Sequence, residues 1–315
     1  MVSLPAHLRW PAVVLVLMAA ASCSTPPGGP GIGTAPSTSL SNPSTSPGAG
    51  PLTAQISQFR DNYSRQIIEI QLTNTTGEPI TVLAAGLQSQ LFASEIGWNA
   101  ADAGTELPPG QTKSLPARLP AASCPDPAAA QGRAADPPAA DVEVVLAPAA
   151  GAPGRTVTTV ATDPFGVLPR NNSEMCVAQA AADVAEFRFG PALELSPDAR
   201  TAVLHLVIAP RHPAGDPSDR ELTINSIGAT TLLEEDGSAP WPTGLRVDAA
   251  GPVRELRLGI RPARCDPHAV AEDKVGTLIP LHVTVAGREG ALKVDAGAQL
   301  RGRIYDFVTS ACGRQ

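Results

Sequence analysis

Cysteine is the residue type whose spacing in this sequence most directly suggests chemistry. Cys124 with Cys176, and Cys265 with Cys312, make two pairs of similar separation. Joined as disulfides in an oxidising compartment, each pair would close a loop of about 50 residues and contribute about 4 kcal/mol through chain entropy. Four cysteines allow three connectivities, and the similar separations favour this one. We therefore predict the disulfide bonds Cys124–Cys176 and Cys265–Cys312.

The other reactive side chains form no motif for catalysis or metal binding. The sequence has no HExxH, CxxC or G-x-S-x-G pattern, and its Gly-rich tract does not lie between a strand and a helix. His268 beside Asp266, and the acidic run Glu234–Asp236, carry side chains that could bind metal ions, but both occur in turn-forming contexts. We expect no metal, no cofactor and no catalytic residue.

Two arginines mark a possible binding face. Arg257 and Arg261 lie on the outer face of one expected strand, beside Glu255, because alternate residues of a strand face opposite sides. His205 points outward from another strand, since both of its neighbours are leucines. Ion pairs across strands would neutralise such a face; alternatively, the arginines bind an anionic ligand such as an acidic envelope polymer. Arg257 and Arg261 are therefore candidate binding residues.

The N-terminal residues have the features of an export signal. Arg9 precedes an apolar stretch, Pro11–Ser22, which is shorter than the roughly 20 residues needed to cross a bilayer. A basic start, a short apolar middle and small residues at the end are typical of a secretory signal peptide. We predict a signal peptide over residues 1–22 and hence an extracytoplasmic protein.

The end of this segment, Ala20-Ala21-Ser22-Cys23, resembles the lipobox of bacterial lipoproteins, a family that prefers Leu where this chain has Ala20. The resemblance implies that Cys23 is acylated, becomes the mature N-terminus and anchors the protein to the cell membrane. Cleavage after Ala21, which would leave Cys23 as a free thiol, is the alternative. Residues 23–50, rich in Ser, Pro, Gly and Thr, have almost nothing to bury, so we expect a disordered linker.

The remainder of the chain contains an internal repeat. Apolar residues alternate with mainly polar ones at the same offsets before the first cysteine of each pair: Leu115, Ala117 and Leu119 before Cys124, and Leu256, Leu258 and Ile260 before Cys265. Such alternation indicates a strand with one buried face. Pairs of valines also recur at equal offsets after the two cysteines. We predict two domains, residues 51–180 and 181–315.

Each predicted domain holds about seven short alternating segments separated by turn residues, which favours antiparallel sheets packed as a sandwich. This organisation resembles the immunoglobulin-like (Ig-like) modules of bacterial surface proteins. The expected fold class is all-β: two tandem Ig-like antiparallel β-sandwich domains after a signal peptide and a disordered linker. One larger two-lobed β-domain is the alternative. An Ala-rich helix is expected over residues 173–183, with no counterpart after Cys312.

Composition and charge narrow the functions that fit. A net charge of −7 and a pI of about 5.3 disfavour a nucleic-acid partner. With 3 Trp, 2 Tyr and 6 Phe, the core must consist mainly of Val, Leu, Ile and Ala.

The sequence as a whole predicts a non-enzymatic, lipid-anchored cell-envelope protein. Its two domains would present a binding or assembly surface to an envelope protein or a cell-wall polymer. Trp98 and Trp241, in loops at residues 88–104 and 234–244, are candidate anchors, because Trp is enriched where partners bind. The alternatives are a carrier or sensor of a small ligand or metal held between the domains and, in third place, a secreted hydrolase.

Overall fold

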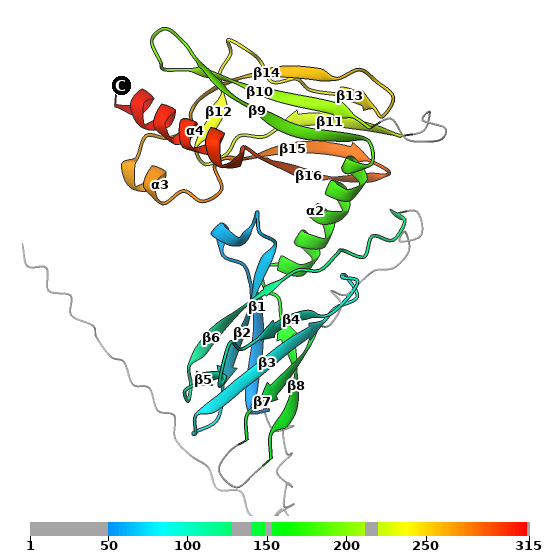
Figure 1. Cartoon of the computed structure of the whole chain (residues 1–315), viewed down its shortest axis with the longest axis vertical. Coiled ribbons are helices and arrows are strands. Elements are labelled where there is room, and N and C mark those ends of the chain that lie inside the picture. The colour runs from blue at the N-terminus through cyan, green and yellow to red at the C-terminus, as the bar shows by residue number, and fades with distance from the viewer. Residues whose placement is uncertain (1–49, 128–139, 149–152, 212–219, 314–315) are drawn as a thin grey trace, which may run out of the picture. The chain divides into compact units, whose positions relative to one another are not determined.

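A computed structural model describes residues 50–127, 140–148, 153–211 and 220–313. The predicted signal peptide, Cys23 and nearly all of the predicted linker lie outside these residues. Strands dominate the described chain, and all but one of the described strand pairs are antiparallel, in agreement with the all-β prediction (Figure 1). We use the names module 1 for residues 51–180 and module 2 for residues 181–315.

The described residues of module 1 form one sheet of eight strands. Its elements are β1 (Leu52–Ser57), the 3-10 helix η1 (Arg60–Asn62), β2 (Ile67–Asn74), β3 (Ile80–Gln88), β4 (Ile96–Asn99), β5 (Thr105–Leu107), β6 (Thr112–Arg118), β7 (Ala140–Leu146) and β8 (Arg155–Thr162). The order across the sheet is β4-β3-β7-β8-β1-β2-β6, with β5 paired to β3. β1 runs parallel to β8 and antiparallel to β2. The sheet curls until β4 lies beside β6, so that it encloses one core.

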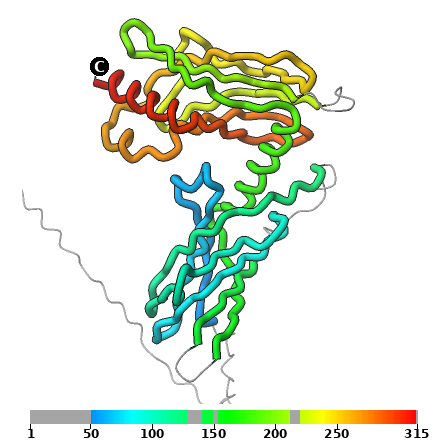
Figure 2. The backbone as a smooth tube through the Cα atoms, viewed as in Figure 1, coloured from blue at the N-terminus to red at the C-terminus, as the bar shows by residue number. Residues whose placement is uncertain are grey.

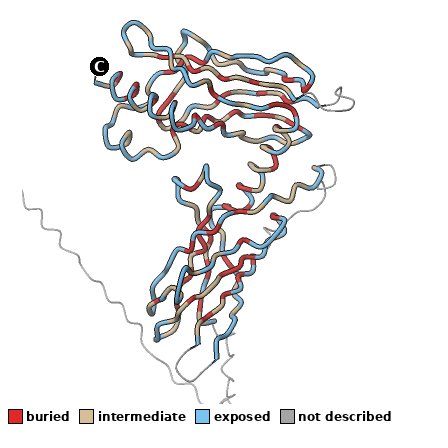
Figure 3. Tube along the Cα trace, in the orientation of Figure 1, coloured by how far each residue is buried: buried red, intermediate tan, exposed pale blue. Residues whose placement is uncertain are grey.

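The alternation in the sequence explains how this sheet is held together. Ile68 and Ile70 of β2 lie opposite Ala117 and Leu115 of β6, and all four side chains are buried. Among the described residues, the buried core of module 1 is aliphatic apart from Phe92. Buried and exposed stretches accordingly alternate along the strands (Figure 3).

In module 2, the residues that the structure describes form two four-stranded sheets. Its elements are β9 (Ala185–Leu195), β10 (Ala202–Pro210), β11 (Glu221–Ile227), β12 (Leu233–Glu235), β13 (Leu245–Asp248), β14 (Arg254–Pro262), α3 (Pro267–Ala271), β15 (Leu278–Val285), β16 (Arg288–Asp295) and α4 (Gly297–Cys312). The strand orders are β12-β14-β10-β9 and β13-β11-β15-β16. Leu204 and Leu206 from the first sheet and Ile224 and Leu281 from the second share one core.

The two modules repeat the same pairing scheme, and Figure 2 traces the chain through both. The second strand of each pairs with the strand that precedes the first cysteine, β2 with β6 and β10 with β14. The third strand of each pairs with the first strand of a hairpin, as in β3-β7-β8 and β11-β15-β16. A helix follows the hairpin in both modules, α2 (Val167–Ala182) in the first and α4 in the second. The repeat in the sequence therefore corresponds to a repeat in strand pairing.

The helices correct one sequence-based expectation, the start of α2, and add a helix in module 2 that the sequence pattern does not predict. α2 begins at Val167, earlier than the predicted residue 173, because the Asp163 carboxylate caps it by accepting hydrogen bonds from the backbone N–H groups of Val167 and Leu168 at 2.7 and 2.8 Å. The helix also has a counterpart in module 2, but α4 lies before Cys312 instead of after it. Leu300, Ile304 and Val308, spaced by four residues, bury one side of α4.

α2 differs from α4 in that it continues beyond its cysteine. Val167 and Leu168 in its first turn belong to the core of module 1, whereas Val177 and Ala181 belong to the core of module 2. One helix therefore contributes to both cores, and it crosses the predicted boundary at residue 180.

Candidate functional site on the outer face of module 2

The outer face of the β9-β10-β14 sheet gathers the charged residues of interest. Leu204 and Leu206 of β10 are buried, so His205 between them points to the outer face, as the alternation predicts. His205 lies opposite Arg257 of the neighbouring strand β14. The register of the β10-β14 pair therefore places the imidazole and the predicted arginine side by side.

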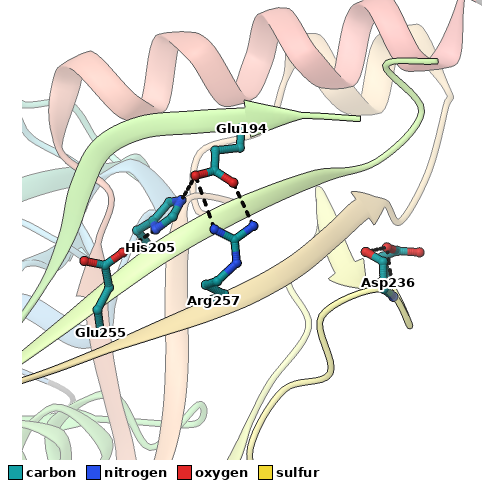
Figure 4. A network of polar contacts seen from close by, with 6 residues as sticks. Glu194, His205, Asp236, Glu255 and Arg257 are labelled. Atoms are coloured by element: carbon teal, nitrogen blue, oxygen red, sulfur yellow. Dashed lines mark hydrogen bonds and ion pairs between the residues drawn. The ribbon is translucent and has the colours of Figure 1, made fainter. Parts of the chain in front are cut away.

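An irregularity in the edge strand β9 brings a third charged side chain to this face. Leu204 of β10 pairs with Leu193 of β9, and Leu206 pairs with Phe189. A step of two residues along β10 is therefore matched by a step of four along β9, which is a bulge in β9. Gly190 faces His205 in the widened stretch, where an added Cβ would lie 3.4 Å from the His205 Cβ. The bulge thereby leaves room for the imidazole and places Glu194 beside it (Figure 4).

His205 lies between two carboxylates. Its Nδ1 atom is 2.6 Å from Glu255 Oε1, and its Nε2 atom is 2.9 Å from Glu194 Oε1. The contact from Nδ1 to Glu255 has hydrogen-bond geometry. The contact from the buried Nε2 to Glu194 is close enough for an ion pair but does not have hydrogen-bond geometry. The His205 side chain is 12% exposed, and the two glutamates are about half exposed. The arrangement links three strands through one imidazole (Figure 4).

Arg257 holds Glu194 from the other side. Its Nη2 and Nη1 atoms donate to the two carboxylate oxygens at 2.7 and 3.3 Å. These hydrogen bonds hold the pKa of Glu194 below its usual value, with a smaller contribution from His205, and they raise the pKa of Arg257. Glu194 is therefore ionised at neutral pH.

The protonation state of His205 decides how many of these contacts its ring can donate to. A neutral imidazole has one N–H donor and one acceptor nitrogen, whereas an imidazolium donates from both. Both ring nitrogens lie near carboxylate oxygens, so a protonated ring would have an acceptor close to each N–H, although only the Nδ1 contact has hydrogen-bond geometry.

Three of the four predicted binding residues lie close together on β14 and the loop that covers it. Arg261 pairs with Glu234 of β12 at 2.9 Å. Trp241 donates its indole N–H to the Gly259 carbonyl at 2.8 Å. Gly259 lies between Arg257 and Arg261 on β14. Both guanidinium groups are therefore engaged by glutamates, and the indole closes a loop over the strand.

Trp98 is placed apart from this group. It lies on β4 in module 1, opposite Ala85, and is partly buried against the core of that module. The structure therefore does not bring the two predicted tryptophans into one site. Each packs locally against the core of its own module.

The two cysteine pairs expected from spacing are those that the structure joins. Cys124 and Cys176 have a Cα–Cα distance of 5.5 Å, and Cys265 and Cys312 one of 5.2 Å. Each bond connects the segment after a long strand, β6 or β14, to the helix that ends the repeat. The cystines thus tie equivalent parts of the two modules.

A second polar cluster ties α4 to the loop before β15. Tyr305 donates its hydroxyl to the Asp273 carboxylate at 2.9 Å, and Thr231 and the Gly276 N–H also donate to this carboxylate. Burial, assisted by Asp273, raises the pKa of Tyr305 to about 12. The phenol therefore stays protonated as a donor, and the cluster fixes the loop.

Sequence reasoning finds the arginines of the face but not Glu194. Gly190-Pro191 interrupts the alternation of β9, so the pattern cannot give the register beyond it. The only signal present is the Gly-Pro pair itself, which indicates a bulge or an edge strand.

Two further observations concern metal ions and membranes. Within the part of the chain that the structure describes, no three His, Cys, Asp or Glu side chains are grouped so that they could hold a metal ion. None of the described helices is both long enough and apolar enough to span a bilayer.

Comparisons with known proteins give no family for the chain. No protein-family description matches it, and no curated protein does. Among solved structures, the YadV chaperone is 10% identical with a TM-score of 0.17, over 73% of this chain and 92% of that one. Red sea bream transglutaminase is 9% identical with a TM-score of 0.19, over 78% of this chain and 31% of that one. TM-scores this low assign neither a fold nor a function.

Proposed function

We propose that the chain is a non-enzymatic, lipid-anchored cell-envelope protein whose two Ig-like β-sandwich modules present a surface for binding or assembly. The observation that carries this proposal is the repeated, cystine-closed β module. Disulfides persist in oxidising compartments outside the cytoplasm, and both cysteine pairs lie at disulfide distance. Their presence supports export, the role also predicted for residues 1–22.

The strand pairing supports an Ig-like arrangement. In Ig folds one sheet has the order A-B-E-D and the other contains C-F-G. The order β9-β10-β14-β12 in module 2 matches the first of these, and β11-β15-β16 matches the second. In module 1, β1-β2-β6 and β3-β7-β8 provide the corresponding pairs within one curled sheet.

The β12-β14 region of module 2 is the favoured contact surface. It holds Trp241, Arg257 and Arg261, each fixed by a contact to a neighbouring strand or loop. Side chains that are already ordered lose less conformational entropy when a partner binds. Because the arginines are already paired, the surface suits a partner with mixed charges better than a purely anionic one. The partner would be an envelope protein or a cell-wall polymer.

Photo-crosslinking in intact cells tests the surface. A photoreactive amino acid at Thr243, which is exposed beside Trp241, should give a discrete adduct. The matched control is Thr158, exposed on β8 of module 1, which should give none. No adduct at Thr243, or the same adduct at both positions, would contradict the assignment.

Fatty-acid labelling tests the anchor separately. Cells fed an alkyne fatty acid should label the wild-type chain but not Cys23→Ala, and the variant should leave the membrane fraction. A wild-type chain that stays unlabelled would contradict the lipid anchor and leave the surface assignment to be judged by crosslinking.

A further inference from the structure

We propose that Glu194, His205 and Glu255 form a proton-dependent clasp that ties the edge strand β9 to β10, with Glu255 of β14 holding the imidazole from its other side. The proposal goes beyond the proposed function, because it concerns the outer face of module 2 whatever partner the protein has. It rests on the position of one imidazole between two carboxylates from different strands (Figure 4).

The charged groups around His205 come from both flanking strands. β9 contributes Glu194, with Arg188 further along the same face, and β14 contributes Glu255 and Arg257. The alternate neighbours of His205 on β10 are valines, at positions 203 and 207. The carboxylates that contact the ring are therefore the groups that respond directly to its charge.

Loss of the ring proton affects the two contacts unequally. A neutral imidazole keeps one N–H, and the 2.6 Å contact from Nδ1 to Glu255 has hydrogen-bond geometry, so the proton stays there. Nε2 then presents a lone pair to the ionised Glu194 oxygen at 2.9 Å, which is repulsive. Glu194 retains its two hydrogen bonds from Arg257. The contact that breaks is therefore the one between β9 and β10.

That contact lies where β9 is held least by its backbone. The register shift leaves residues 190–192 without partners in the pairing of β9 with β10. Besides the clasp, Arg257 holds Glu194 in either state of the ring, and Arg303 of α4 donates to the Pro191 carbonyl at 2.8 Å. Protonated His205 thus stabilises the bulged stretch of β9, and neutral His205 loosens it.

Hydrogen exchange of the full mature chain, with both disulfides intact, measures this directly. Amide exchange in residues 190–195 is compared at about pH 5 and about pH 8, on either side of the range in which imidazoles ordinarily titrate. After correction for intrinsic exchange, protection of this stretch should fall several-fold at the higher pH. His205→Gln, which keeps a donor but cannot gain a proton, should remove the pH dependence.

Two further variants complete the test. His282→Gln changes an exposed histidine on β15 and should leave the pH dependence as in wild type. If His205→Gln does not fold, Glu194→Gln takes its place, since a neutral amide tolerates either state of the ring and should also abolish the dependence. Wild-type protection equal at the two pH values, or unchanged pH dependence in the His205 or Glu194 variant, would overturn the clasp.

Discussion

Modules 1 and 2 share strand pairing and a helix tied by a cystine, but different contacts hold their helices. Asn171 and Phe307 each lie five positions before the cysteine of their helix, and both are buried. Asn171 donates to Gln58 Oε1 at 3.0 Å and to the Val167 carbonyl at 2.7 Å. Phe307 packs in an apolar core. At this shared position, hydrogen bonds hold α2, whereas apolar burial holds α4.

The same contrast extends to the strands. Module 1 buries Glu69 and Asn74, and the Asn74 amide donates to the carbonyls of Glu78 and Leu107. Among the described residues of module 2, Thr277 is the buried polar residue. The repeat has thus kept its backbone pairing while the contacts that complete each core have diverged. Backbone pairing and the contacts that complete a core can therefore change independently of each other.

Removing a cystine should produce the largest difference between the modules. Cys265→Ser with Cys312→Ser opens a loop of about 50 residues and should lower the free energy of unfolding of module 2 by about 4 kcal/mol. Calorimetry of the full chain would report a lower melting temperature for one transition. The matched pair, Cys124→Ser with Cys176→Ser, should lower two transitions, because α2 contributes to both cores. Identical effects from the two pairs would contradict the shared role of α2.

Truncating the side chains that hold the helices should come next. Phe307→Ala leaves a cavity in an apolar core and should lower the unfolding free energy by about 3 kcal/mol, measured by urea unfolding. Asn171→Ala should lower it by about 1–2 kcal/mol, since it removes the hydrogen bonds from Asn171 to Gln58 and to the Val167 carbonyl. If Asn171→Ala lowers the unfolding free energy as much as Phe307→Ala does, the proposed difference between hydrogen bonding at Asn171 and apolar packing at Phe307 is wrong.

The smallest expected effect is the pH response of the buried carboxyl in module 1. Burial raises the pKa of Glu69 above its ordinary 4.5, although a hydrogen bond from Asn62 opposes the rise. The folded state then binds the proton more tightly than the unfolded state, so stability falls as the pH rises through the window above 4.5.

Glu69→Gln should abolish this response and raise the melting temperature of module 1 at neutral pH by about 2 °C or less. The measurement is the melting temperature at a series of pH values from about 4 to about 8. A neutral-pH melting temperature that falls in the variant would show that the ionised carboxylate stabilises the module.

Much of the fold can be predicted from the sequence because its signals are local or repeated. Alternation at Leu256 and Leu258 identifies β14, and equal spacing identifies the cysteine pairs. α4 is harder to foresee, since its buried residues recur every four positions among small and polar ones. The start of α2 depends on the Asp163 cap, which precedes the Ala-rich stretch that suggests a helix.

The candidate site is only half predictable. Arg257, Arg261 and His205 follow from period-two alternation, which fixes the face on which a side chain lies. Glu194 does not, because its approach to His205 requires the bulge in β9 and the register of two long strands. Pairing across strands is a tertiary property, and no spacing within β9 alone encodes it.

The place of β1 within its sheet has a mechanical consequence. β1 lies between β8 and β2 and is hydrogen-bonded to both. A pull on the chain ahead of Leu52 acts along the length of this strand. It therefore loads the bonds to both neighbours together, in shear, instead of peeling them away one at a time.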